Sequence, residues 1–74
     1  MNMRATIEDR VKALVRRMAG AAVCDECITD RLDLSSVAQT AVVTLAASGG
    51  DGFERLRAPC TLCARDKPVI RHKA

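Results

Sequence analysis

Four cysteines, arranged as two pairs, are the residues of this 74-residue chain whose type and spacing suggest chemistry. Cys24 and Cys27 stand in CDEC, Cys60 and Cys63 stand in CTLC, and the chain has no other cysteine. Two residues between paired cysteines let both sulfurs reach one ion from a single tight turn, so four such thiolates are typical of a closed tetrahedral Zn²⁺ site. We expect one structural zinc ion, with a redox pair or unligated thiols as the alternatives.

The cellular compartment decides whether paired cysteines bind a metal or form disulfides. The segment MNMRATIEDRVKALVRR lacks an apolar run followed by a small-residue cleavage site. No stretch of the sequence approaches the about 18 apolar residues that cross a bilayer. We therefore expect a cytoplasmic protein, not associated with a membrane, whose thiols stay reduced.

A chain this small needs a cross-link, such as one metal ion bound by both cysteine pairs, to fold stably. A domain this small buries only about 60% of its unfolded surface, and Phe53 is its one aromatic residue. Between the cysteine pairs lie residues 28–59, which are 32 in number, whereas about 15–20 are usual for such sites. The intervening segment must therefore fold into a compact unit that brings its two ends together.

Helix signals occupy the first two thirds of the chain. Residues 6–19 are predicted to form an amphipathic, basic helix, because Thr6 and Asp9 resemble a capping box and apolar residues recur at helical spacing. Residues 24–48 are predicted to form two helices joined by a tight turn, the second capped by Ser36 with Gln39. The run TAVVTL leaves a partly strand-like alternative open for residues 36–48.

The last third of the chain predicts a β-hairpin over residues 53–72, with PCTLC at its tip. Pro68 indicates a sheet edge or the start of a strand, because proline cannot donate a hydrogen bond to a neighbouring strand. One cysteine pair would then lie at a helix start and the other at the hairpin tip, joined by one ion.

The phrase CITDRLDLSS resembles a widespread helix-turn-helix phrase. Its positions are Ile28, Arg31, Leu32, Asp33, Leu34 and Ser35, with Asp33 where glycine is usual. Residues 22–72 are similar to a group of small, uncharacterised bacterial zinc-binding proteins that carry this phrase between two CxxC pairs. The resemblance implies zinc and a winged-helix-like layout in which the terminal hairpin is the wing. We expect a single α+β domain over residues 1–74.

Charge is distributed unevenly and argues against sequence-specific reading of DNA. Residues 1–23 carry five basic and two acidic groups, residues 24–52 carry one basic and five acidic, and residues 53–74 carry six basic and two acidic. The net charges are therefore +3, −4 and +4. The predicted recognition helix, residues 36–48, has no charged residue to place against bases or phosphates.

Basic residues on the flanks still permit contacts with phosphates, and a solvated surface is the alternative for them. The candidates for nucleic-acid contact are Arg55, Arg57, Arg65, Lys67, Arg71, Lys73, Arg16 and Arg17. Single-stranded nucleic acid is a poorer fit, because base stacking needs more aromatic residues than Phe53 alone.

The helix predicted over residues 36–48 has its hydroxyl residues on one narrow stripe, since they recur every four residues. Its other residues are mostly Val, Ala and Leu, which indicates a largely buried helix. It either forms the centre of the domain or leaves Val42, Val43 or Ala46 exposed as a surface for self-association or for a partner protein.

Enzymatic activity is not expected from this sequence. A catalytic zinc keeps an open position, whereas four cysteines close the site, and His72 is the one histidine, in a basic tail. No phosphate-binding loop or evident small-molecule site is present. We predict a non-enzymatic regulatory or adaptor module that acts through protein association, with a winged-helix DNA-binding transcriptional regulator as the alternative.

Overall fold

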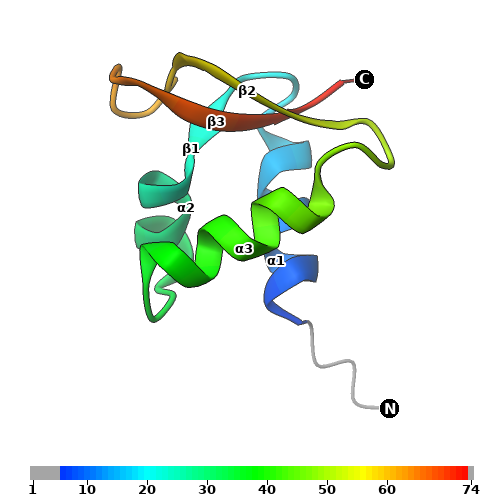
Figure 1. Cartoon of the computed structure of the whole chain (residues 1–74), viewed down its shortest axis with the longest axis vertical. Coiled ribbons are helices and arrows are strands. Elements are labelled where there is room, and N and C mark those ends of the chain that lie inside the picture. The colour runs from blue at the N-terminus through cyan, green and yellow to red at the C-terminus, as the bar shows by residue number, and fades with distance from the viewer. Residues whose placement is uncertain (1–5, 74) are drawn as a thin grey trace.

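The structure is a computed structural model, and it describes residues 6–73. This part of the chain forms three helices and a three-stranded antiparallel sheet (Figure 1). The elements follow one another as α1 (Ile7–Arg17), β1 (Val23–Cys24), α2 (Asp25–Leu32), α3 (Val37–Ala47), β2 (Phe53–Pro59) and β3 (Asp66–His72). The predicted α+β class is confirmed. The first five residues and Ala74 of the predicted domain lie outside the described residues.

Helix α1 begins at a complete capping box. The Asp9 N–H donates to Thr6 Oγ1 at 3.0 Å, and the Thr6 N–H donates to Asp9 Oδ2 at 3.3 Å. The helix ends at Arg17, two residues earlier than predicted, because Ala19 and Gly20 adopt left-handed backbone conformations with φ of 54° and 91°. Its buried residues are Val11, Leu14 and Val15.

The two helices expected over residues 24–48 are both present. Helix α2 ends at Leu32, and its C-cap residue Asp33 has a left-handed φ of 54° that aspartate tolerates. Helix α3 begins at Val37, and the Oγ of its N-cap residue Ser36 accepts from the Gln39 N–H at 3.1 Å. The strand-like alternative for this segment is wrong, since residues 37–47 are wholly helical.

The sheet has one strand more than the sequence predicted. Strands β2 and β3 form the expected hairpin, with Phe53 opposite His72 and Pro59 opposite Asp66. Strand β1 pairs with the other edge of β3, which gives the order β1-β3-β2. Two residues are too few to show strand periodicity in a sequence. Pro68 lies within a central strand, but β1 reaches only Val69 and Ile70, so the strand is locally an edge at the proline.

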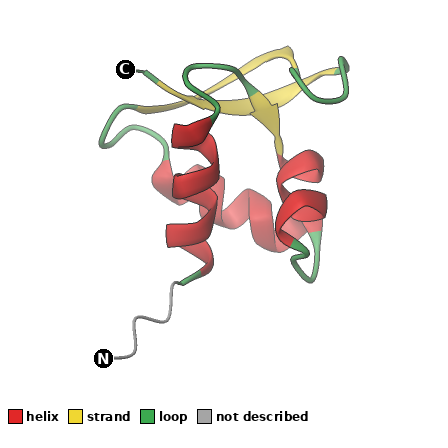
Figure 2. Cartoon of the chain, turned by 180° about the vertical axis from the view of Figure 1, so that it is seen from behind, coloured by secondary structure: helices red, strands yellow, loops and turns green. Residues whose placement is uncertain are grey.

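The helices pack on one side of the sheet, and the core lies between them. From behind, α1 and α2 stand in front of α3, which crosses them as an outer layer (Figure 2). The core is aliphatic apart from Phe53 and two cysteines; its members are Val11, Leu14, Val15, Val23, Cys24, Ile28, Ala47, Phe53, Cys60, Val69 and Ile70. Within residues 6–73, no helix is both long enough and apolar enough to cross a bilayer.

Helix α3 turns its two threonines inward and most of its large aliphatic residues outward. Thr40 and Thr44 are 0% exposed, whereas Val42 is 67% and Leu45 59% exposed. The prediction of a largely buried helix is therefore correct only for the threonine stripe and Ala47. The reason lies in the neighbouring elements, which offer the threonines polar partners.

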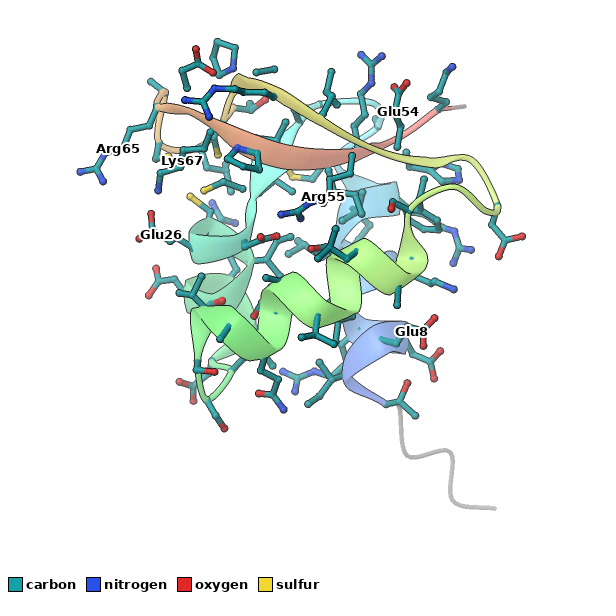
Figure 3. All side chains as sticks on the ribbon, in the orientation of Figure 1. Glu8, Glu26, Glu54, Arg55, Arg65 and Lys67 are labelled. Atoms are coloured by element: carbon teal, nitrogen blue, oxygen red, sulfur yellow. The ribbon has the colours of Figure 1, made fainter. Side chains whose placement is uncertain are left out.

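Those partners form a buried polar network beneath α3. Arg55 donates to both carboxylate oxygens of Asp25 at 3.1 Å and to Thr44 Oγ1 at 2.6 Å, and Thr44 donates to Asp25 Oδ1 at 2.9 Å. Figure 3 shows Arg55 in the space between the sheet and α3. A second hydroxyl pair, Thr29 and Thr40, lies 2.6 Å apart. Because these groups satisfy one another, the network fixes which face of α3 points inward.

We expect Arg55→Ala to lower the free energy of unfolding by about 3–5 kcal/mol, because it leaves the Asp25 carboxylate buried without its counter-ion. The matched control is Arg57→Ala on the same strand. Its partner Asp66 is 3.7 Å away and both side chains are mostly exposed, so the loss should stay below about 1 kcal/mol. Urea denaturation of both metal-loaded variants measures the difference, and equal losses would contradict the role given to the network.

Candidate metal centre

The four cysteine sulfurs meet at one point in the fold. All four Sγ atoms lie within 4.8 Å of one another, and the cysteines are unbridged. Cys24 Sγ is 3.8 Å from Cys63 Sγ, and Cys27 Sγ is 3.7 Å from Cys60 Sγ. A tetrahedral site with metal–sulfur bonds of about 2.3 Å requires sulfurs about 3.8 Å apart. The cluster therefore has the size and the donor set of a four-thiolate metal site.

Two segments that are distant in the sequence supply the four cysteines. Cys24 ends β1 and occupies the N-cap position of α2, and Cys27 lies in the first turn of that helix. Cys60 and Cys63 lie in the turn between β2 and β3. The cysteine pairs thus occupy a helix start and a hairpin turn, as the sequence predicted, and the long insert between them folds back through α3 and β2.

Backbone hydrogen bonds hold the hairpin turn in shape and dock it against the rest of the chain. The Cys60 N–H donates to the Arg65 carbonyl at 2.8 Å, and the Ala64 N–H donates to the Cys60 carbonyl at 2.7 Å. Ala64 takes a left-handed φ of 64°, which closes the turn. The Thr61 N–H donates to the Ala22 carbonyl at 2.9 Å, so the turn is joined to the segment that enters β1.

In the absence of a cation, the site lowers the pKa of Cys60 and raises the pKa of Cys24 and of Cys27. Burial raises the pKa of Cys60, but N–H groups of Cys63, Cys24 and Leu62 outweigh it and lower the pKa to about 6. Burial, followed by the neighbouring cysteines, raises the pKa of Cys27 well above its ordinary value. Four thiolates this close would repel one another, so a bound cation is what lets them coexist.

A four-sulfur site of this kind leaves no open position for a substrate. Cys24 and Cys60 are buried and the other two are partly buried, so a bound ion would be enclosed by the chain. His72 does not reach the cluster; its Nε2 lies 3.0 Å from the Asp51 carbonyl, and its ring packs edge-on against Phe53. The chemistry that the arrangement supports is structural cross-linking of α2 to the hairpin.

The basic residues predicted to contact nucleic acid have varied surroundings. Arg55 points inward, into the network beneath α3, which gives it an internal role. Lys67 forms an ion pair with Glu26, and Arg71 pairs with Glu54 at 2.7 Å. Figure 3 shows Arg65 pointing away from the body of the molecule. The exposed Arg57 pairs loosely with Asp66.

The remaining candidates lie at two places on the surface. Arg16 stacks over the ring of Phe53, with its guanidinium carbon 5.2 Å from the ring centroid. Arg17 and Lys73 are exposed. These eight residues are thus spread over α1, the hairpin and the interior, and the structure does not bring them together into one patch.

The residues predicted to form an interface also differ in how exposed they are. Val42 and Ala46 lie on the exposed face of α3, whereas Val43 packs partly against the core. Sequence reasoning missed Leu45 and Val37, which are 59% and 41% exposed. It also missed the ion pair of Asp25 with Arg55. The four-residue spacing of Thr40 and Thr44 was the available signal, since an inward hydroxyl stripe requires buried polar partners.

Comparison with protein-family models, with curated proteins and with solved structures found no match. The metal-binding arrangement therefore rests on the four clustered sulfurs. No comparison supports the resemblance of the phrase CITDRLDLSS to bacterial helix-turn-helix proteins, which stays an expectation from the sequence.

We expect Cys60→Ser to abolish both metal binding and the helical signal in circular dichroism, because metal binding and folding are coupled in domains this small. Thr61→Ser, in the same turn, is the matched control and should keep both. Elemental analysis and circular dichroism of the two purified variants measure the effect. A Cys60→Ser protein that melts like the unmodified chain would contradict the role given to the site.

Proposed function

We propose that this chain is a small, non-enzymatic binding module, held together by one Zn²⁺ ion, that contacts another protein through the outward face of α3. The residues of that face, which we call the α3 face, are the exposed Val37, Ala38, Val42, Leu45 and Ala46 and the partly buried Ala41. The observation that carries the proposal is that large aliphatic side chains on this helix stand in solvent while its threonines are buried. A continuous apolar helix face that is exposed to water is typical of an interaction site.

Zinc is the ion that the donor set favours. Four thiolates at tetrahedral spacing are typical of structural zinc, and soft sulfur ligands exclude magnesium and calcium. Reduced thiols agree with the expected cytoplasmic location. In this proposal the ion has no catalytic part; it keeps the start of α2 against the hairpin.

The buried polar network beneath α3 supports the proposal, because it holds the α3 face in one orientation. The first turn of α2 carries both Cys27, a metal ligand, and Asp25, which binds Arg55 of β2 and Thr44 of α3. Anchoring α2 through the metal therefore also anchors the groups that orient α3. A surface that is ordered before binding loses little conformational entropy when a partner arrives.

The order α1-β1-α2-α3-β2-β3, with the sheet order β1-β3-β2, supports a winged-helix-like layout as a finer description of the fold. In that layout α3 would be the helix that reads DNA and the turn between β2 and β3 would be the wing. The α3 face offers only aliphatic side chains, which cannot make the paired hydrogen bonds that distinguish bases. Protein association is therefore the better-supported use of α3, and DNA binding stays a prediction.

A photo-crosslinking residue at position 42, in the cells that make the protein, should form a discrete adduct with a protein identified by mass spectrometry. Leu45→Asp should suppress the adduct, because it places a charge in the same apolar face. The control position is Ala13, which is exposed on α1. Equal adducts from positions 42 and 13, or adducts with nucleic acid alone, would contradict the proposal.

The DNA-binding alternative makes the opposite prediction for a gel-shift titration with duplex DNA. Phosphate contacts release counter-ions, so specific binding through the basic residues would weaken steeply as salt is added. We expect no tight complex, and we expect Arg57→Ala and Arg65→Ala to leave the titration unchanged. A tight complex with a steep salt dependence that these substitutions reduce would favour the alternative.

A further inference from the structure

The α3 face carries large and small side chains in an order that is complementary to a second, antiparallel copy of the same face. Its members Ala38, Ala41, Val42, Leu45 and Ala46 have the spacing i, i+3, i+4, i+7, i+8, so they form one continuous stripe along the helix. Resting on the function proposed above, we infer that the partner is a second copy of the chain. The two α3 helices pack antiparallel about a twofold axis, with Ala38 opposite Leu45 and Ala41 opposite Val42.

The register follows from matching large residues with small ones. In an antiparallel pair whose facing residue numbers sum to 83, each large side chain meets an alanine: Val37 with Ala46, Leu45 with Ala38, and Val42 with Ala41. In the register whose facing residue numbers sum to 84, Val42 would face Val42 and Ala38 would face Ala46. The first pair is crowded, and the second leaves a gap. Interfaces pack as densely as protein interiors, so the matched register is the stable one.

A parallel pairing does not share this match. Each residue would then face its own copy, so that leucine meets leucine and alanine meets alanine along the stripe. The antiparallel arrangement also sets the positive end of one helix dipole beside the negative end of the other. Twofold pairing is the commonest symmetry of homodimers, and it uses the same patch on both subunits.

Charge also favours a second copy over a charged partner. Helix α3 has no charged residue in its whole length, so two copies meet without like-charge repulsion, and the face offers no charge that would select a basic or an acidic protein. The chain has a formal net charge of +3. Four thiolates and one Zn²⁺ add −2, which leaves about +1, so long-range repulsion between two copies is small.

The α3 face is accessible to a second copy. Figures 1 and 2 agree that α3 forms an outer layer, with α1 and α2 on its other side. The inward side of the helix is held by Thr44 through Asp25 and Arg55, so the α3 face is set before association. The two copies therefore meet as rigid surfaces.

The small contact area limits the strength expected of the dimer. Eleven residues give a helix about 16 Å long. A pair of such helices buries less than the about 800 Å² per partner of a standard stable interface. We therefore expect a reversible dimer in the micromolar range whose affinity changes little with salt, since the contact is apolar.

Sedimentation equilibrium of the zinc-loaded full chain tests the dimer and its register through a size swap. Leu45→Ala should weaken dimerisation about tenfold or more, because the twofold symmetry removes the contact of Leu45 with Ala38 twice. Ala38→Leu should also weaken it, because leucine then opposes leucine. The double variant Ala38→Leu with Leu45→Ala should recover most of the affinity, since each leucine again opposes an alanine. Both positions are exposed in the single chain, so folding should be unaffected, and circular dichroism checks this.

A chain that remains monomeric up to roughly millimolar concentration would overturn the inference. Failure of the double variant to recover, or single variants that dimerise like the unmodified chain, would overturn the register. The proposed function fails separately. If position 42 crosslinks to a different protein while the chain is monomeric, the binding module stands and the dimer does not; an adduct of twice the chain mass supports both.

Discussion

The convergence of four sulfurs on one point is the constraint on which the rest of this structure depends. The chain has a small aliphatic core with a single aromatic residue, Phe53, and folds of this size rarely gain more than about 3–5 kcal/mol from the core alone. The cysteine cluster joins β1 and the start of α2 to the turn between β2 and β3. In doing so it closes the long insert between the pairs, and α3 is held within that closed segment.

A second constraint acts on α3 and has a different physical origin. Asp25 directly follows Cys24 of the cysteine cluster, and its carboxylate binds Arg55 from the sheet and Thr44 from α3. Buried ion pairs contribute modestly to net stability, but they penalise any arrangement that separates the partners. In this protein the pair therefore disfavours an orientation of α3 that would bury Val37, Val42 and Leu45. An apolar face therefore stays in solvent, where it is available for association.

Much of the fold and of the metal centre could be predicted from local sequence signals. The caps at Thr6 and Ser36 and the left-handed Asp33 depend on residues that are close in the sequence. The two-residue spacing within each cysteine pair likewise lets both sulfurs point to the same place. The remainder depends on partners that are distant in the sequence. Strand β1 exists only because β3 lies beside it, and Arg55 is buried only because Asp25 faces it. The stripe of Thr40 and Thr44 could be read as polar and outward or as buried and satisfied, and only the tertiary contacts decide between the two.

X-ray absorption spectroscopy at the zinc edge tests the central claim most directly, because it reports the atoms bonded to the metal in the intact protein. The account predicts one zinc per chain with four sulfur neighbours at about 2.3 Å and no nitrogen or oxygen ligand. A metal-free protein that keeps its fold, or a zinc ion bound by fewer than four sulfurs, would contradict it.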